Sequence, residues 1–339
     1  MVRAPYVVEV VDVPDPAPRP GRVVVRVDAA SICGSDLSGF KGVNPRNRLP
    51  TIPGHEIAGT VEAAGDDGSL ALVGRRVIVE PNVSCGSCEW CGRGLPNVCD
   101  AYRVLGQDMD VPGGLAEYVE VAAGQVHLLP GHVAAAEGAL VQPLSIAYHG
   151  VVARAAVEAG EVALILGAGP IGLAALLFAR HVGARALVTD VSADRLATAS
   201  ALGAEVVLRA DQVDVGQAVR DVTGGRGADV TFEAVGGAQD QTIADAVAAT
   251  ATRGRIVVFG TFGKGPQSIP AYAFKGRELT MMGSSGHPNT FGPTLDLVAS
   301  GRIRPADLIT HTLPLAEVER AFGLLDSQAD GVIKVVVEP

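Results

Sequence analysis

The sequence predicts an α/β fold with a β-rich domain and a second domain built on a doubly wound parallel sheet. The chain has 339 residues, which suits two domains of about 100–200 residues each. Its first half carries short apolar or alternating runs between turn residues, a pattern typical of β-strands. Its middle alternates apolar runs with helical stretches, a pattern typical of a parallel sheet.

The first half predicts a compact, barrel-like or sandwich-like β domain. Valines recur at every second position from Val23 to Val27, which is the period of a half-buried strand. Further strands are expected at 57–61, 77–79 and 115–121. Helical pattern is scarce before about residue 134.

The middle predicts strands that are covered on both faces, because their apolar runs are nearly continuous. Strands are expected at 162–166, 186–189, 206–208, 230–232 and 256–259, with helices at 171–182 and 193–202. The end of the chain mixes types, with helices expected at 294–299 and 316–325 and strands at 309–313 and 332–337.

Composition excludes several classes of protein. Hydrophobic residues make up 48% and charged residues 19%, which provides a sizeable core and excludes general disorder. The net charge of −10 argues against a nucleic-acid or anionic-membrane surface. The chain shows neither a run of about 20 uncharged apolar residues nor a secretory signal at its start, so we expect no membrane partner and a cytoplasmic location.

A glycine-rich motif follows the first strand expected in the middle of the chain. Gly167, Gly169 and Gly172 form G-x-G-x-x-G, with Pro170 and Ile171 inside it. A strand before the motif and a helix after it are the context of a dinucleotide-binding loop. Such glycines permit a tight turn, close approach of a pyrophosphate, and close helix–strand packing. A plain strand–helix turn without a ligand is the alternative.

An acidic residue ends the next apolar run. Asp190 lies 18 residues beyond Gly172, where a carboxylate accepts hydrogen bonds from the adenosine ribose. It would repel a 2′-phosphate, so NAD is favoured over NADP, although Arg195 is near enough to accommodate a phosphate. A simple helix-entry role for Asp190 remains open.

Four of the five cysteines crowd into one short segment and predict a structural zinc site. Cys85, Cys88, Cys91 and Cys99 supply four thiolates, which matches a closed tetrahedral site. An iron–sulfur cluster also takes four cysteines, but Asp100 stands where the familiar ferredoxin run has proline. Unligated thiols are the remaining alternative.

Cys33, His55 and Glu56 are candidates for a second metal centre. All three lie in Gly-flanked turns, and three protein ligands with an open fourth position are typical of catalytic zinc. Taken singly, Cys33 fits a buried core thiol and His55 a satisfied loop histidine.

The order of these motifs resembles that of the zinc-dependent medium-chain dehydrogenase/reductase family. CGSD at 33–36, GHE at 54–56, the cysteine segment, and GAGPIG with Asp190 follow one another as in that family, over essentially the whole chain. The polyol (sorbitol) and threonine dehydrogenase branch is the one it most resembles. The resemblance implies a GroES-like catalytic domain at 1–145, with the zinc lobe at 82–102. It further implies a Rossmann domain at 146–284 and a return of 285–339 to the first domain.

The resemblance also implies roles by position. Cys33, His55 and Glu56 would surround a catalytic zinc, Ser35 would relay the alcohol proton, and Asp36 would orient the histidine. The four clustered cysteines would hold a second, structural zinc, and the glycine motif with Asp190 would bind NAD. A homodimer or homotetramer is implied, and the family usually opens with one more short strand than we see here.

Gln142 departs from the polyol branch, which usually has glutamate in this segment. Its direct ligation to zinc is therefore open, with Glu56 or water as alternatives. One thiolate and one carboxylate leave Zn²⁺ formally neutral, whereas a second carboxylate would weaken its Lewis acidity. Gln142 is equally suited to bind a substrate hydroxyl or to support the pocket.

We therefore expect reversible NAD-linked oxidation of a secondary alcohol to a ketone. The substrate class is a polyol, a sugar, a cyclitol or aminocyclitol (2-deoxy-scyllo-inosamine-like), or an amino alcohol. The alternatives are an L-threonine 3-dehydrogenase-like enzyme, a non-catalytic NAD-binding protein on the same scaffold, and a zinc-free NADPH-dependent enone reductase. Asp190 and the cysteine segment count against the last of these.

Overall fold

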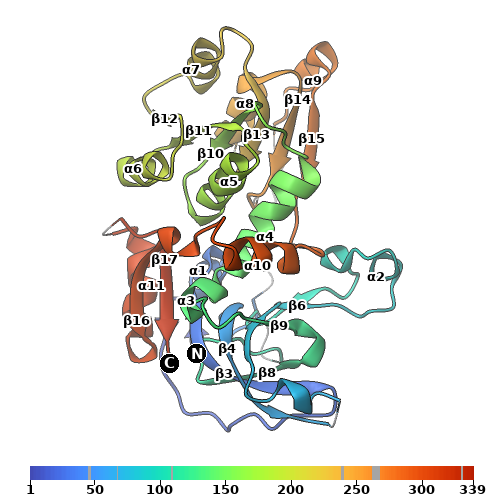
Figure 1. Cartoon of the computed structure of the whole chain (residues 1–339). Coiled ribbons are helices and arrows are strands. Elements are labelled where there is room, and N and C mark those ends of the chain that lie inside the picture. The colour runs from blue at the N-terminus through green and yellow to red at the C-terminus, as the bar shows by residue number, and fades with distance from the viewer. Residues whose placement is uncertain (45–46, 67, 108–109, 238–239, 262–267, 330) are drawn as a thin grey trace. The chain divides into compact units, whose positions relative to one another are not determined.

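The chain divides into two compact units, which we describe from a computed structural model (Figure 1). The structure describes all residues except 45–46, 67, 108–109, 238–239, 262–267 and 330. One unit comprises residues 1–142 and 288–339, and the other comprises residues 143–287.

The unit formed by residues 143–287 contains a parallel six-stranded sheet. Its strands are β10 (Val162–Leu166), β11 (Arg185–Asp190), β12 (Val206–Arg209), β13 (Ala228–Glu233), β14 (Thr250–Val258) and β15 (Thr280–Gly283). They are ordered β12-β11-β10-β13-β14-β15, and each neighbouring pair is parallel. The strand order switches from one side of β10 to the other between β10 and β13, which is the position at which sheets of this kind bind ligands. The expected doubly wound sheet is confirmed.

Helices connect these strands. They are α5 (Pro170–His181), α6 (Ala193–Ala201), α7 (Val215–Val222), α8 (Asp240–Ala249) and α9 (Ala271–Arg277). Helix α4 (Val141–Tyr148) and a π-helical segment (His149–Arg154) precede them. Leu164 and Ile165 of β10 are fully buried, which fits a strand covered on both faces.

The other unit is built on a seven-stranded sheet. Its strands are β3 (Arg22–Ser31), β4 (Glu56–Ala64), β5 (Arg76–Val79), β8 (Tyr118–Ala122), β9 (Val126–Leu128), β16 (Ile309–Pro314) and β17 (Lys334–Glu338). The order is β16-β17-β3-β4-β5-β9, and β8 pairs with β3. The last strand of the chain therefore lies beside β3, with Val336 opposite Ser31.

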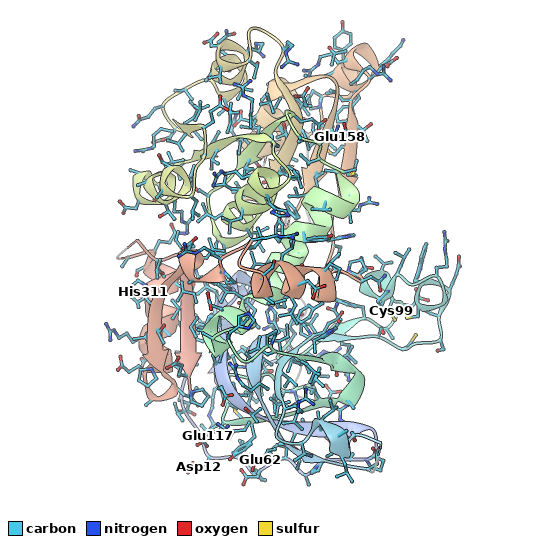
Figure 2. All side chains as sticks on the ribbon, viewed as in Figure 1. Asp12, Glu62, Cys99, Glu117, Glu158 and His311 are labelled. Carbon is cyan, nitrogen blue, oxygen red and sulfur yellow. The ribbon has the colours of Figure 1, made fainter. Side chains whose placement is uncertain are left out.

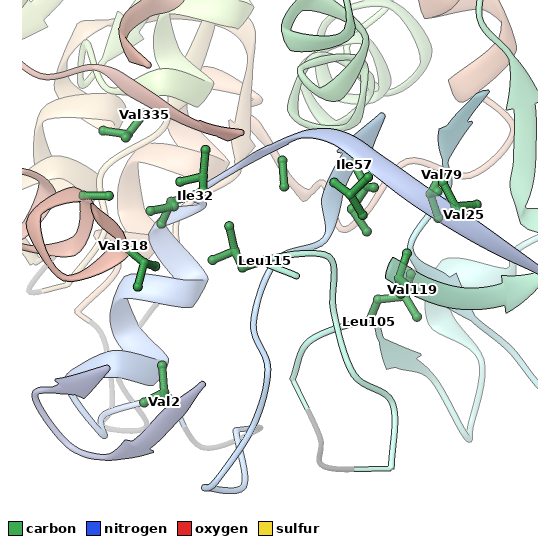
Figure 3. Close-up of a cluster of buried hydrophobic side chains, with 14 of the residues drawn as sticks. Val2, Val25, Ile32, Ile57, Val79, Leu105, Leu115, Val119, Val318 and Val335 are labelled. Carbon is green, nitrogen blue, oxygen red and sulfur yellow. The ribbon is translucent and has the colours of Figure 1, made fainter. Parts of the chain in front are cut away.

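The core of this unit gathers side chains from distant parts of the chain. Ile32, Ile57 and Val335 are each at most 2% exposed and belong to one cluster (Figure 3). The helices of this unit are α1 (Gly34–Phe40), the short α2 (Glu89–Gly92), α3 (Ala135–Ala139), α10 (Phe291–Ala299) and α11 (Val318–Ser327). Its short strands outside the large sheet are β1 (Val2–Ala4), β2 (Val7–Val8), β6 (Asn82–Val83) and β7 (Arg103–Val104). Among the described residues, no helix is both long and apolar enough to span a membrane.

The expected strands occur, with small differences at their ends. The strand expected at 115–121 begins only at Tyr118, because Leu115 lies in a loop and donates its N–H to the Pro53 carbonyl. Helix α1 was not expected, since its sequence GSDLSGF lacks an apolar stripe. The Cys33 N–H is instead satisfied by the Asp36 carboxylate at 2.9 Å, which stabilises the first turn.

Candidate metal centres and cofactor loop

Cys33, Ser35 and Asp36 are placed at the start of helix α1. Cys33 is the residue before the helix, and its N–H bonds to Asp36 Oδ2. Asp36 is 1% exposed, and its other oxygen accepts the N–H of Gly54 at 3.3 Å. One buried carboxylate therefore joins the CGSD turn to the GHE turn.

His55 and Glu56 lie where the chain enters β4. Gly54 has a φ of +99°, and a Cβ there would meet the backbone nitrogen of Leu115 at 2.7 Å, so glycine is required. His55 is 4% exposed and Glu56 0% exposed. The ligand atoms of Cys33, His55 and Glu56 all lie within 4.8 Å of one another. The two turns thus bring thiol, imidazole and carboxylate together, which is a donor set suited to zinc.

Asp36 faces one ring nitrogen of His55 and Ser35 faces the other. Asp36 Oδ1 lies 3.4 Å from His55 Nδ1, and Ser35 Oγ lies 3.5 Å from His55 Nε2. Burial alone raises the pKa of Asp36, but His55 and the backbone donors outweigh it and lower that pKa. Burial likewise lowers the pKa of His55, but Asp36 and Cys33 outweigh it and raise that pKa well above its usual value. Asp36 therefore orients the ring through Nδ1, and a metal held by His55 would bind Nε2 in place of its proton.

The carboxylate of Glu56 already has protein partners. Lys334 Nζ lies 2.6 Å from Oε1 and 2.5 Å from Oε2, and the Ser31 hydroxyl donates to Oε2. Lys334 is 2% exposed and comes from β17. Sequence reasoning did not find Lys334, because the only signal was one lysine within the apolar run 332–337.

Gln142 is buried in the first turn of α4, with 4% exposure. Its side-chain oxygen Oε1 has no hydrogen-bond partner among the described residues. An unpaired buried amide oxygen is costly, so this atom is suited to accept a hydrogen bond or to bind a metal.

The four clustered cysteines converge in the segment that contains α2, and Figure 2 labels Cys99 there. Their sulfur atoms all lie within 4.8 Å of one another. The N–H groups of Ser87 and Cys88 point at the sulfur of Cys85 and lower the pKa of that thiol to about 6. Burial and the thiols of Cys88 and Cys99 raise the pKa of Cys91 to about 11, so this cluster would hold four thiolates only around a cation.

The glycine motif forms the turn between β10 and α5 (Figure 1). Gly167 has a φ of +96°, which favours glycine, and a Cβ on Gly172 would lie 1.8 Å from the Gly167 carbonyl oxygen. Helix α5 begins at Pro170, and Ile171 is its second residue. These glycines therefore allow the tight turn and the close helix–strand approach of a dinucleotide loop.

Asp190 closes this loop from the neighbouring strand. Its Oδ2 accepts the N–H of Ala168 at 2.7 Å, and its Oδ1 accepts the N–H of Ser192 at 2.8 Å. The side chain is 8% exposed. The backbone N–H of Arg195 bonds to the Ser192 hydroxyl, as expected where α6 begins.

Two protein-family models match the chain. The model of the alcohol dehydrogenase GroES-like domain matches residues 19–131, and that of the zinc-binding dehydrogenase domain matches residues 170–300. A sorbitol dehydrogenase of Bombyx mori is 36% identical over 340 residues, which cover 98% of this chain and 96% of that protein. The chain belongs to the zinc-binding alcohol dehydrogenases. This dehydrogenase is an oxidoreductase, and the resemblance noted in its sequence is confirmed.

A second relative of the dehydrogenase is named for its action on a sugar derivative. A 2-dehydro-3-deoxy-L-galactonate 5-dehydrogenase of Pseudoalteromonas atlantica is 36% identical over 324 residues, which cover 95% of this chain and 93% of that protein.

Solved structures of similar proteins contain nicotinamide cofactors. The alcohol dehydrogenase RspB of Escherichia coli, complexed with NADH, has a TM-score of 0.92 and 30% identity, and the match covers 100% of this dehydrogenase and 98% of that chain. A zinc-binding dehydrogenase of Sinorhizobium meliloti, bound to NADP, has a TM-score of 0.93 and 30% identity with the same coverages. Both cofactors therefore occur among proteins similar to this one.

Proposed function

We propose that the dehydrogenase reversibly oxidises a secondary alcohol of a polyol, sugar, cyclitol or aminocyclitol to a ketone, with NAD as the partner cofactor. The proposal rests mainly on the convergence of the Cys33, His55 and Glu56 side chains, with the buried Asp36 beside His55. The sugar- and polyol-directed names of its relatives favour this substrate class. A cytoplasmic homodimer or homotetramer belongs to the same proposal.

Two zinc ions fit the donor sets of this chain. Cys33 and His55, with Glu56, would hold the catalytic ion, and Cys85, Cys88, Cys91 and Cys99 would hold the structural one. The catalytic zinc supplies Lewis acidity that stabilises negative charge on a substrate oxygen, and the nicotinamide supplies the hydride acceptor. The remaining chemistry belongs to the protein's side chains.

Ser35 is suited to move the alcohol proton. Its hydroxyl lies 3.5 Å from His55 Nε2, so it is close to the proposed metal centre. A serine hydroxyl both donates and accepts hydrogen bonds, so Oγ is able to take a proton on one side while releasing another. Asp36 does not take part in that transfer, because its oxygens are directed at His55 and at backbone N–H groups.

Asp190 favours NAD in this proposal. Its carboxylate is fixed by Ala168 and Ser192 beside the glycine loop, where a second negative charge on the ribose would be repelled. Gln142 offers its unpaired Oε1 to a substrate hydroxyl or to the metal. An amide in place of a carboxylate keeps the formal charge around zinc near neutral.

The experiment is a substrate panel with the zinc-loaded protein. NAD⁺ reduction is followed by the absorbance of NADH with polyols, cyclitols, amino sugars and L-threonine as substrates. The same panel is measured in parallel with NADP⁺. Turnover with one polyol, cyclitol or sugar supports the proposal and identifies the class. Turnover with L-threonine alone would contradict the substrate class, and NADH binding without any turnover would favour a non-catalytic protein.

A further inference from the structure

Glu56 and Lys334 form an ion pair that is completely enclosed by protein. Their exposures are 0% and 2%, and Lys334 Nζ reaches both oxygens of the carboxylate at 2.6 and 2.5 Å. Nζ also donates to the Ile32 carbonyl at 3.0 Å. The ammonium group, with three N–H donors, therefore has three acceptors, and one of them belongs to the residue beside Cys33.

Three adjacent strands fix this arrangement. Ser31 of β3 lies opposite Glu56 of β4 and opposite Val336 of β17. The Ile32 N–H bonds to the Val335 carbonyl at 3.0 Å, and Figure 3 shows these two side chains in the same buried cluster. Because β17 is the last strand, a residue near the end of the chain reaches a candidate metal ligand near its beginning.

The charge of Glu56 is therefore compensated before any metal binds. A buried carboxylate without a partner is strongly unfavourable, and the Lys334 ammonium group offsets part of that cost. A zinc ion held by Cys33 and His55 would compete with Lys334 for the same carboxylate oxygens. The ammonium group thus lowers the negative charge that Glu56 presents to the metal.

We propose that Lys334 is a positioning residue of the catalytic metal centre, which holds Glu56 as a charge-compensated, weak ligand. This inference rests on the proposed function, since it takes Cys33, His55 and Glu56 as the zinc site. With Lys334 present, Cys33 is the one ligand that offers the metal a full negative charge. Fewer anionic ligands leave the ion more strongly Lewis acidic.

The test compares the zinc affinity of the wild-type chain with that of Lys334→Met by competition with a chromophoric chelator. Without the ammonium group, Glu56 is left as an uncompensated buried anion that the metal would neutralise, so we expect the catalytic site to bind zinc at least about tenfold more tightly. The visible spectrum of the cobalt-substituted protein changes as well, because the ligand field at this site changes. Both readouts are independent of turnover.

Lys41→Met is the matched control. Lys41 Nζ lies 2.5 Å from Asp326 and also joins the start of the chain to its end, but the two side chains are 31% and 34% exposed. Its removal is expected to leave zinc affinity and the cobalt spectrum unchanged. The double variant Lys334→Met/Glu56→Gln removes both buried charges and is expected to lose the gain in affinity.

Several outcomes would overturn the inference. One is a folded Lys334→Met protein that binds zinc no more tightly than the wild type and has the same cobalt spectrum. If Lys334→Met does not fold, the double variant is the deciding measurement. It should bind zinc within about tenfold of the wild type, and a larger loss contradicts the weak role of Glu56. A wild-type chain that binds only one zinc would instead overturn the proposed function.

Discussion

Asp36 Oδ1 lies 3.4 Å from His55 Nδ1, and both side chains are at least 95% buried. The same carboxylate also accepts the N–H groups of Cys33 and Gly54. One aspartate therefore sets the orientation of the imidazole and holds together the two turns that carry the candidate ligands. Substitution of Asp36 is therefore expected to weaken the candidate metal centre without removal of a ligand.

We predict that Asp36→Asn lowers zinc affinity at the catalytic site by about 10–100-fold, as is typical for residues that orient metal-bound histidines. The amide is similar in size but no longer carries the charge that favours the His55 orientation. Chelator competition measures the effect, and Asp326→Asn on the surface serves as the control. An unchanged zinc affinity would contradict the role of Asp36.

The cysteine segment is predicted to lose its metal independently of the catalytic site. Cys88→Ser should reduce zinc content from two ions per chain to one and should lower the thermal midpoint, because the segment between β6 and β7 depends on the metal for its fold. Catalytic-site zinc is expected to remain. An unchanged zinc content would favour unligated thiols, and an iron signal with visible absorption would favour an iron–sulfur cluster.

The sequence predicted contacts between residues close together in the chain better than contacts between distant residues. The parallel sheet was predictable because most of its strands carry an apolar run of their own, as in β10, and the candidate metal ligands were suggested by short motifs. Helix α1 was not, since its stability depends on the Asp36 contact and not on an apolar stripe. The partnership of Glu56 with Lys334, 278 residues apart, depends on strand order, which local pattern does not show.

We predict that Asp190→Asn weakens NADH binding by about 10–100-fold, as expected for the loss of hydrogen bonds to a charged group. The NADPH dissociation constant should change less, so the preference for NADH narrows. Fluorescence titration with both reduced cofactors measures this, and Asp194→Asn, at an exposed position in the first turn of α6, is the control. An equal loss of affinity for NADH and NADPH would indicate that Asp190 only stabilises the loop and does not discriminate between the two cofactors.

Alanine substitutions at two glycines of the candidate cofactor loop are predicted to affect different properties, stability for one and NADH affinity for the other. A Cβ at Gly172 would meet the Gly167 carbonyl oxygen at 1.8 Å, so Gly172→Ala should cost about 1–3 kcal/mol of unfolding free energy. A Cβ at Gly169 meets nothing within 4 Å, so Gly169→Ala should fold normally and lose NADH affinity. Urea denaturation and cofactor titration of both variants separate the two effects, and a Gly169→Ala protein with normal NADH affinity would contradict the cofactor site.

The proposed dehydrogenase chemistry depends most directly on Cys33 as a ligand of a catalytic zinc. The measurement is zinc content per chain together with NAD⁺ reduction on the best panel substrate, for the wild type and for Cys33→Ser. We predict two zinc ions and turnover for the wild type, against one zinc ion, no turnover and unchanged NADH affinity for Cys33→Ser. A Cys33→Ser protein that still turns over its substrate would contradict the assigned metal centre.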